Sequence, residues 1–213
     1  HQPPSREVGV QQIRMITEQG MNGEILFADG LRRRIALLRA HRSHIEALVQ
    51  HLHGKISASF VRNQAFLREY ADQILVVSSG FKEFIVPVVT ALGLNAEHVF
   101  ANEFYFDSDG NVTGIDEQNV LAQDGGKVKL MRMLRAGDML NQQALKFDPR
   151  QISDVYVIGD GYTDYQIRES GQATAFYAFT ENVERAKVTA NADAVIPSLD
   201  EFLYVHGLPR SQS

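Results

Sequence analysis

Apolar residues along the chain occur in short continuous runs and in stripes that recur every three or four positions. Two continuous runs, at 74–78 and 155–159, are rich in β-branched residues and stop at hydroxyl or carboxylate side chains. Runs of this kind are typical of buried strands in a parallel sheet. Weaker signals predict further strands at 173–179 and 194–196, and a hairpin from 99–106 and 112–115.

Stripes of helical spacing alternate with these strands. One follows Gly80 and ends at Gly93, a second begins at the DGGK segment 124–127, and a third covers 183–190. Helices that alternate with strands predict an α/β fold, because a crossover helix connects each pair of parallel strands. The polar tail 207–213 is expected to fray.

Residues 6 to about 53 contain helical stripes and no convincing strand. A break with turn chemistry at 20–23 separates the first two stripes, and the third predicts a helix over 41–53. We therefore expect two domains, a helical cap at 1–58 and an α/β core at 59–213. The inward-facing positions of the third helix are expected to be Ile45, Leu48 and Leu52.

Composition narrows the class of protein. The 213 residues carry 21 basic and 26 acidic side chains, and this net charge of −5 argues against a nucleic-acid partner. No apolar run approaches the ~20 residues that span a bilayer, so we expect no membrane segment and a cytoplasmic location. Cysteine is absent, which excludes disulfides and zinc–thiolate sites.

The GDGYTD segment, Gly159–Asp164, carries the strongest candidate chemistry. It follows a predicted parallel strand, and α/β proteins bind ligands at the carboxyl ends of such strands. Carboxylates suit a hard cation such as Mg²⁺, so we expect Asp160 to ligate the metal directly and Asp164 to bind it through water or to fix a lysine. The alternative is that both aspartates only cap a turn and a helix.

Lys127 and Ser78 also stand at predicted element boundaries. Lys127 would neutralise a phosphoryl group and a carboxylate nucleophile beside it, or else be a solvated first-turn residue that opposes the helix dipole. Ser78 would donate its hydroxyl to a phosphate oxygen, assisted by the backbone N–H groups of Ser79 and Gly80 at the next helix start. Its alternative role is a helix N-cap.

These segments, in this order, resemble the haloacid dehalogenase superfamily and its phosphoserine phosphatase-like branch, over roughly residues 8 to 205. The resemblance implies a Rossmann-like core with a parallel sheet and a small helical cap domain. It also implies Mg²⁺-dependent hydrolysis of a small phosphomonoester through an aspartyl-phosphate.

The resemblance assigns a role to each candidate residue. Ser78 matches the family's second motif and Lys127 its third, while Asp160 and Asp164 match its fourth. The substrate contacts implied within these motifs are Ser79, Gly80 and Thr163. Ser79 departs from the glycine that is common there, and its Cβ would narrow the approach of the substrate without forbidding activity.

Residues of the predicted cap resemble the family's substrate-facing segment. Arg34 matches the arginine that grips the phosphoserine carboxylate, and Met21 and Phe27 match apolar lid residues. A guanidinium fork suits a planar carboxylate, which favours O-phosphoserine as the substrate. The alternative for the adjacent arginines 32–34 is a solvated helix face.

The family's first motif, an Asp-x-Asp-x-Thr at the end of a first strand, has no match before Val8. In the family it supplies the nucleophile and the general acid and base. The only Asp-x-Asp, at 107–109, follows Ser78 and precedes Gly110, which instead indicates a hairpin turn. The sequence also opens without Met, so we expect a fragment that is inactive by itself.

Three functions remain open. The first is a phosphoserine phosphatase-like enzyme, the second a non-catalytic phospho-ligand-binding or regulatory module, and the third a phosphatase of the same branch for another small phosphate ester. The segments 124–127 and 159–164 also look like a subgroup fused to a phosphoglycerate dehydrogenase. That resemblance suggests serine biosynthesis and a dehydrogenase domain as a fused or associated partner.

Overall fold

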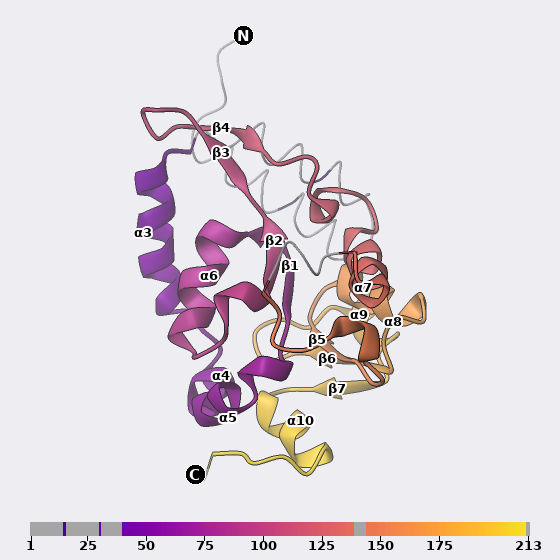
Figure 1. Ribbon diagram of the computed structural model, residues 1–213. Helices are drawn as coiled ribbons and strands as arrows, with labels where there is room; N and C mark the ends of the chain where they lie inside the picture. The colour runs from indigo at the N-terminus through magenta and orange to yellow at the C-terminus, as the bar shows by residue number, and fades with distance from the viewer. Residues whose placement is uncertain (1–14, 16–29, 31–39, 139–143, 212–213) are drawn as a thin grey trace.

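The structure of the chain is a computed structural model that describes residues 40–138 and 144–211, together with Met15 and Gly30 (Figure 1). The helices are α3 (Arg42–His53), α4 (Ala58–Arg62), α5 (Gln64–Glu69), α6 (Lys82–Ala91), α7 (Gly126–Ala136), α8 (Tyr162–Glu169), α9 (Ala186–Thr189) and α10 (Leu199–Val205). Short 3₁₀ turns are η1 (Ala71–Gln73), η2 (Ala96–His98), η3 (Val120–Ala122) and η4 (Pro149–Gln151). The strands are β1 (Val76–Phe81), β2 (Val99–Asn102), β3 (Phe104–Phe106), β4 (Val112–Ile115), β5 (Tyr156–Gly159), β6 (Ala175–Phe179) and β7 (Ala194–Ile196).

The parallel strands form two sheets. β1 pairs with β2, with Val76 opposite Val99, while β5, β6 and β7 form a second sheet in that order. Helix α6 connects β1 to β2 and helix α8 connects β5 to β6, as parallel pairing requires. The predicted α/β fold with parallel strands is confirmed.

β1 and β5 belong to one layer of the protein. Val76 and Ile158 both contact a hydrophobic cluster on the α10 side, whereas Val77 and Val157 both contact a second cluster on the α7 side. Among the described residues, no hydrogen-bonded pairing joins β1 to β5. The α10-side cluster comprises Phe66, Leu67, Ala71, Leu92, Leu94, Leu199 and Leu203, and the α7-side cluster Phe100, Leu121, Leu130, Met131, Leu134, Ile167 and Ala173.

These two strands are less buried than their outer neighbours. The valines and isoleucine of β1 and β5 are half-buried, and Tyr156 at the start of β5 is 43% exposed, although that strand was predicted to be buried. All four residues of β2 are buried, and Phe176 of β6 is 0% exposed. Strands in the middle of a parallel sheet are normally buried on both faces. Within the described residues, β1 and β5 are therefore both unpaired along one edge and incompletely buried.

The end of β1 lies further along the chain than the apolar pattern predicts. The strand covers Val76–Phe81 rather than 74–78. Phe81 pairs with Asn102 of β2, and its ring stacks on Phe104 with the ring centroids 3.7 Å apart. This aromatic contact holds the chain extended to Phe81 before α6 begins.

The predicted hairpin is only partly correct. The run 99–106 divides into β2, which is parallel to β1, and β3, which is antiparallel to β4. Asn102 marks the division, because its side-chain amide donates to the backbone oxygens of Ser79 and Leu121, each at 3.1 Å. The predicted helix at 183–190 is also shortened, to α9.

Helix α3 follows its prediction, with one exception on its inward face. It packs against α6, and Ile45 is buried as expected. Leu48 is 40% exposed, so the prediction that it faces inward was wrong. The division into a cap at 1–58 and a core at 59–213 stays a prediction.

The carboxyl-terminal tail docks on the protein as far as Ser211, contrary to the expectation of fraying. The Leu208 N–H donates to the Leu203 oxygen at 2.8 Å, and the Ser211 N–H donates to Asn63 Oδ1 at 2.8 Å. Asn63 is only 1% exposed. The tail is therefore fastened to α4 and α10 by buried polar groups that sequence periodicity does not show.

Candidate active site

Gly159 is the residue at which β5 ends and the candidate site begins. A Cβ at this position would lie 2.3 Å from Asp164 Oδ2, far closer than two non-bonded atoms approach. Glycine is therefore required here, because the Asp164 carboxylate packs directly against the backbone at the strand end. The first glycine of the GDGYTD segment thus leaves room for the side chain of its last aspartate.

Asp164 is the third residue of α8 and links that helix to α7. Its Oδ2 accepts the Gly161 N–H at 3.1 Å and its Oδ1 accepts Lys127 Nζ at 2.6 Å. Asp164 thus contacts the lysine, as one of its expected roles requires. Helix capping is equally present, because one carboxylate oxygen serves each partner.

Lys127 is the second residue of α7, and the glycines before it allow the helix to start there. Gly125 has φ +64°, and a Cβ on Gly126 would lie 2.4 Å from the Val120 backbone oxygen. Lys127 itself is 8% exposed, so the alternative of a solvated first-turn residue was wrong. An ammonium group this buried needs a partner, which Asp164 supplies.

Asp160 occupies a more open position. Its side chain is 41% exposed, and the guanidinium of Arg185 approaches its Oδ2 at 3.5 Å. The same Arg185 Nη1 donates to the Asp160 backbone oxygen at 3.2 Å. Sequence analysis did not single out Arg185, because it lies in a different predicted element and carries no motif.

Ser78 does not cap a helix. Its Oγ accepts the Gly80 N–H at 3.0 Å, while α6 has Phe81 at its N-cap position with no side-chain hydrogen bond. Ser79 and Gly80 therefore lie in the extended strand, and the prediction that their N–H groups stand at a helix start was wrong. The cause is the longer β1, which Phe81 holds extended through its contact with Phe104.

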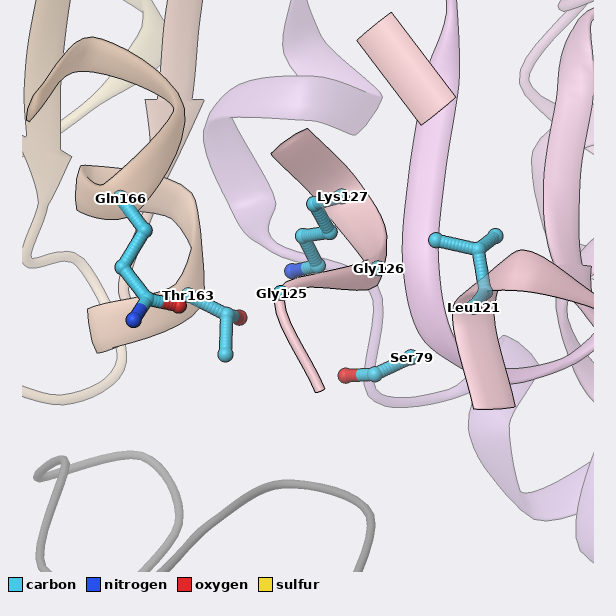
Figure 2. Close-up of a pocket in the computed structure, with 7 residues that line it drawn as sticks. All are labelled: Ser79, Leu121, Gly125, Gly126, Lys127, Thr163 and Gln166. Atoms are coloured by element: carbon cyan, nitrogen blue, oxygen red, sulfur yellow. The ribbon is translucent and has the colours of Figure 1, made fainter. Parts of the chain in front are cut away.

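A small pocket opens between α7, α8 and the end of β1. Figure 2 shows the Lys127 ammonium and the hydroxyls of Thr163 and Ser79 around the same space. Thr163 Oγ1 is buried and has no hydrogen-bond partner among the residues that the structure describes. A buried hydroxyl without a partner costs free energy, so it marks a position where a ligand oxygen would be stabilising. The lining residues are Ser79, Leu121, Gly125, Gly126, Lys127, Thr163 and Gln166.

The structure brings only some of the predicted residues together. Lys127, Thr163 and Ser79 line the pocket, Asp164 holds Lys127, and Asp160 precedes the same helix. Ser78 and Gly80 are not among the pocket-lining residues that the structure describes. The cap residues Met21, Phe27 and Arg34 lie outside the described residues.

The carboxylates near the pocket limit how a metal ion would bind. In residues 40–138 and 144–211, no group of three or more His, Cys, Asp or Glu side chains could hold a metal. Asp164 is committed to Lys127, whereas Asp160 keeps an exposed carboxylate. Mg²⁺ commonly takes one or two protein carboxylates and completes its shell with water and phosphate oxygens, which fits a single ligand at Asp160.

Asp107 lies in the turn between β3 and β4, away from α7 and α8 (Figure 1). Its carboxylate accepts the N–H groups of Asp109 and Asn111 and the Asn111 side-chain amide, and these hydrogen bonds keep the pKa of Asp107 below its usual value. The interpretation of this segment as a hairpin turn is confirmed.

None of the helices described here is both long and apolar enough to cross a bilayer.

Comparison with known proteins finds relatives that match most of the chain. A sequence model of the haloacid dehalogenase-like hydrolase family matches residues 5–169. The phosphoserine phosphatase of Mus musculus is 30% identical over 188 residues, which cover 88% of this chain and 77% of that protein. The chloroplastic phosphoserine phosphatase of Arabidopsis thaliana is 29% identical over 187 residues, and the chain spans 59% of its length.

A solved structure shows a similar fold. The phosphoserine phosphohydrolase-like protein of Francisella tularensis superposes with a TM-score of 0.76 at 27% identity, covering 94% of this chain and 86% of that one. The fold, the ordered motifs and the sequence matches agree. The chain therefore belongs to the haloacid dehalogenase-like hydrolase family, in its phosphoserine phosphatase-like branch.

Proposed function

We propose that the chain forms the phosphate-binding and metal-binding part of a phosphatase that hydrolyses a small phosphomonoester, with O-phosphoserine favoured. The observation that carries this proposal is the Lys127–Asp164 pair beside the unpartnered Thr163 hydroxyl in one pocket. A fixed cation and a free hydroxyl are the groups that a phosphoryl oxygen requires. The relatives named phosphoserine phosphatase support the choice of substrate.

Each residue of the site then has a separate task. Lys127 neutralises charge on the phosphoryl group, and Asp164 keeps the ammonium aimed into the pocket. Thr163 donates its hydroxyl to a phosphate oxygen. Ser79, which lines the pocket, takes the role of hydroxyl donor that was expected of Ser78. Asp160 would hold Mg²⁺, which when bound neutralises phosphate charge.

The nucleophile requires a further carboxylate, because none of the described residues that line the pocket carries one. β1 and β5 share both faces with the same two clusters, yet they are half-buried and unpaired with each other in the described residues. If a parallel strand that ends in the nucleophilic aspartate completes the site, the unpaired edges of β1 and β5 are where it would pair. An aspartyl-phosphate would form on that strand, next to Lys127.

The finer parts of this proposal rest on resemblance. Arg34 would bind the substrate carboxylate from the cap, with Met21 and Phe27 beside it. The same resemblance leads us to propose a role in serine biosynthesis and association with a dehydrogenase domain, and we also propose a cytoplasmic location. A non-catalytic phospho-ligand-binding module is the alternative outcome, and the lack of a carboxylate in the described pocket lining favours testing it directly.

The first experiment separates binding from hydrolysis. Phosphoserine binding to the 213-residue chain in Mg²⁺ is measured by calorimetry, and phosphate release is measured with and without a synthetic apolar strand peptide that ends in Asp-x-Asp. We expect binding that Lys127→Ala abolishes, and phosphate release only with the peptide. Binding without release under both conditions would favour the regulatory module, and absence of binding would contradict both functions.

The second experiment tests the substrate in the complemented protein. Arg34→Lys keeps the charge but loses the bidentate fork, so kcat/KM for phosphoserine should fall by about 1.5–3 kcal/mol. Hydrolysis of a phosphate ester that lacks a carboxylate should barely change. Equal losses on both substrates, or none on either, would instead favour a phosphatase for another ester.

A further inference from the structure

Two cation–carboxylate pairs lie at this end of the fold, and they differ in kind. The Lys127–Asp164 pair is short and closed, with a contact of 2.6 Å and side-chain exposures of 9% and 15%. The Arg185–Asp160 pair is longer and open, with a contact of 3.5 Å and side-chain exposures of 10% and 41%. The arginine is thus nearly as buried as the lysine, while its aspartate faces solvent.

Arg185 donates a hydrogen bond to the backbone of Asp160 in addition to its ion pair with the carboxylate. Its Nη1 donates to the Asp160 backbone oxygen at 3.2 Å, whereas the 3.5 Å approach to Oδ2 is an ion pair. The guanidinium therefore fixes the backbone of Asp160 and attracts its carboxylate, while the carboxylate oxygens can still bind another ligand. Such a carboxylate has a set direction and still has lone pairs for another ligand.

The segment that carries Arg185 is itself anchored. β6 runs parallel to β5 with Ala178 opposite Gly159, so both strands end at the same edge of the sheet. Just after β6, Glu181 accepts the backbone N–H and the hydroxyl of buried Ser59. Arg185 then stands at the N-cap position of α9. These anchors give the guanidinium a defined position over the end of β5.

We propose that Arg185 is a positioning residue for the metal site: it holds Asp160 at the end of β5 and balances its charge until a divalent cation binds. This inference rests on the proposed function, in which Asp160 is the metal ligand. Lys127 cannot take the role, because its ammonium is held by Asp164. The buried pair thus serves the phosphoryl group, and the open pair serves the metal.

The test measures binding of Mg²⁺ alone to the 213-residue chain by calorimetry, so that activity is not the readout. Arg185→Met removes both contacts at similar side-chain length, and the Kd for Mg²⁺ should rise about tenfold, the low end of the effect for residues that orient a metal ligand. Arg185→Lys retains the charge and one donor group, so its loss should be smaller. If the Met variant does not fold, the Lys variant still tests the proposal, because an unchanged Kd would overturn it.

A matched control comes from the same region. Arg168 of α8 forms an ion pair with Asp193 at 3.0 Å, so its carboxylate partner is a different one from that of Arg185. Arg168→Met should leave the Kd for Mg²⁺ unchanged. Equal weakening in the Arg168 and Arg185 variants would show a general loss of structure and overturn the positioning role.

The double variant separates this inference from the proposed function. In an Asp160→Asn background, Arg185→Met should cause no further change in Mg²⁺ affinity, since Arg185 acts through Asp160. If Asp160→Asn alone leaves Mg²⁺ binding intact, the proposed metal site fails. If Asp160→Asn abolishes binding and Arg185→Met leaves it at the parent value, only the role of Arg185 fails.

Discussion

Lys127 illustrates how one side chain at this site depends on its neighbours. It is 8% exposed, and its ammonium is neutralised by an aspartate that another helix presents. Neither partner is tolerable in that position alone, because a buried charge without a counter-charge is destabilising. The same burial that makes the pair costly to break keeps the ammonium fixed for chemistry.

Lys127→Ala should lower the free energy of unfolding by about 1–3 kcal/mol, below the range for fully buried pairs because Asp164 retains some exposure. Phosphoserine binding should be lost as well. Urea denaturation and calorimetry measure the two effects. Lys129→Ala on the same helix is the control, because Lys129 is exposed and its ammonium donates to Gln123 Oε1 over 3.4 Å, so its replacement should change stability by less than about 0.5 kcal/mol. Equal effects of the two substitutions would remove the special role of Lys127.

Gly159 gives a second test at the same scale. In Gly159→Ala the new Cβ meets the Asp164 carboxylate at 2.3 Å, so Asp164 must move and release Lys127. Both stability and phosphoserine binding should fall. Gly114→Ala, in β4, adds a Cβ with nothing within 4 Å and should leave binding unchanged. Phosphoserine binding at the parent level in Gly159→Ala would contradict the packing of Asp164 against the strand end.

At the scale of elements, the contact between α6 and β3 contains a partly buried carboxylate, that of Glu83, whose pKa is raised. Glu83, in the first turn of α6, accepts the Phe104 N–H at 3.0 Å, while its Oε2 is buried and has no hydrogen-bond partner in the described part of the chain. Burial raises the pKa of Glu83, with Glu103 adding to the rise, and the hydrogen bonds and Arg42 opposing it. Folding therefore disfavours the ionised form of Glu83 relative to its protonated form.

The sign of the pH dependence follows from this direction. A carboxyl group whose pKa is raised by folding contributes stability that is fully present below its unfolded pKa and is lost as the pH rises through the folded pKa. Glu83→Gln stays neutral and still accepts from Phe104, so it should gain stability relative to the parent as the pH rises above the ordinary glutamate range. Thermal melting between pH 4 and 8 measures the difference, and Glu46→Gln in α3 controls for the loss of one exposed negative charge. A constant difference across the range would contradict the pKa direction of Glu83.

At the scale of the whole molecule, the layer that contains β1 and β5 leads to a prediction about the activity of the chain by itself. The two strands share both hydrophobic clusters but are not paired with each other in the described residues. The 213-residue chain with Mg²⁺ should release phosphate from phosphoserine only at the background rate. Steady turnover by the chain alone, abolished by Asp107→Asn, would contradict this prediction and make Asp107 the nucleophile.

The sequence by itself predicted most of the elements and proposed the candidate site residues. β-branched runs that stop near glycine predicted the parallel strands β1 and β5, and helical stripes predicted α6, α7 and α9, because both patterns reflect local geometry and burial of one face. The DGGK and GDGYTD segments pointed to Lys127, Asp160 and Asp164 for a similar reason. Glycine is forced wherever backbone and side chain meet closely, and such positions are visible in a sequence.

Only the tertiary structure decided which of these residues meet. Ser78 was displaced from its expected helix start because Phe81 stacks on Phe104, a contact between two elements that no local pattern contains. Arg185 reaches Asp160 because β5 and β6 end at the same edge of a parallel sheet. Periodicity records which face of an element is buried, but partners distant in sequence are chosen by packing and by the pairing of charges that folding removes from water.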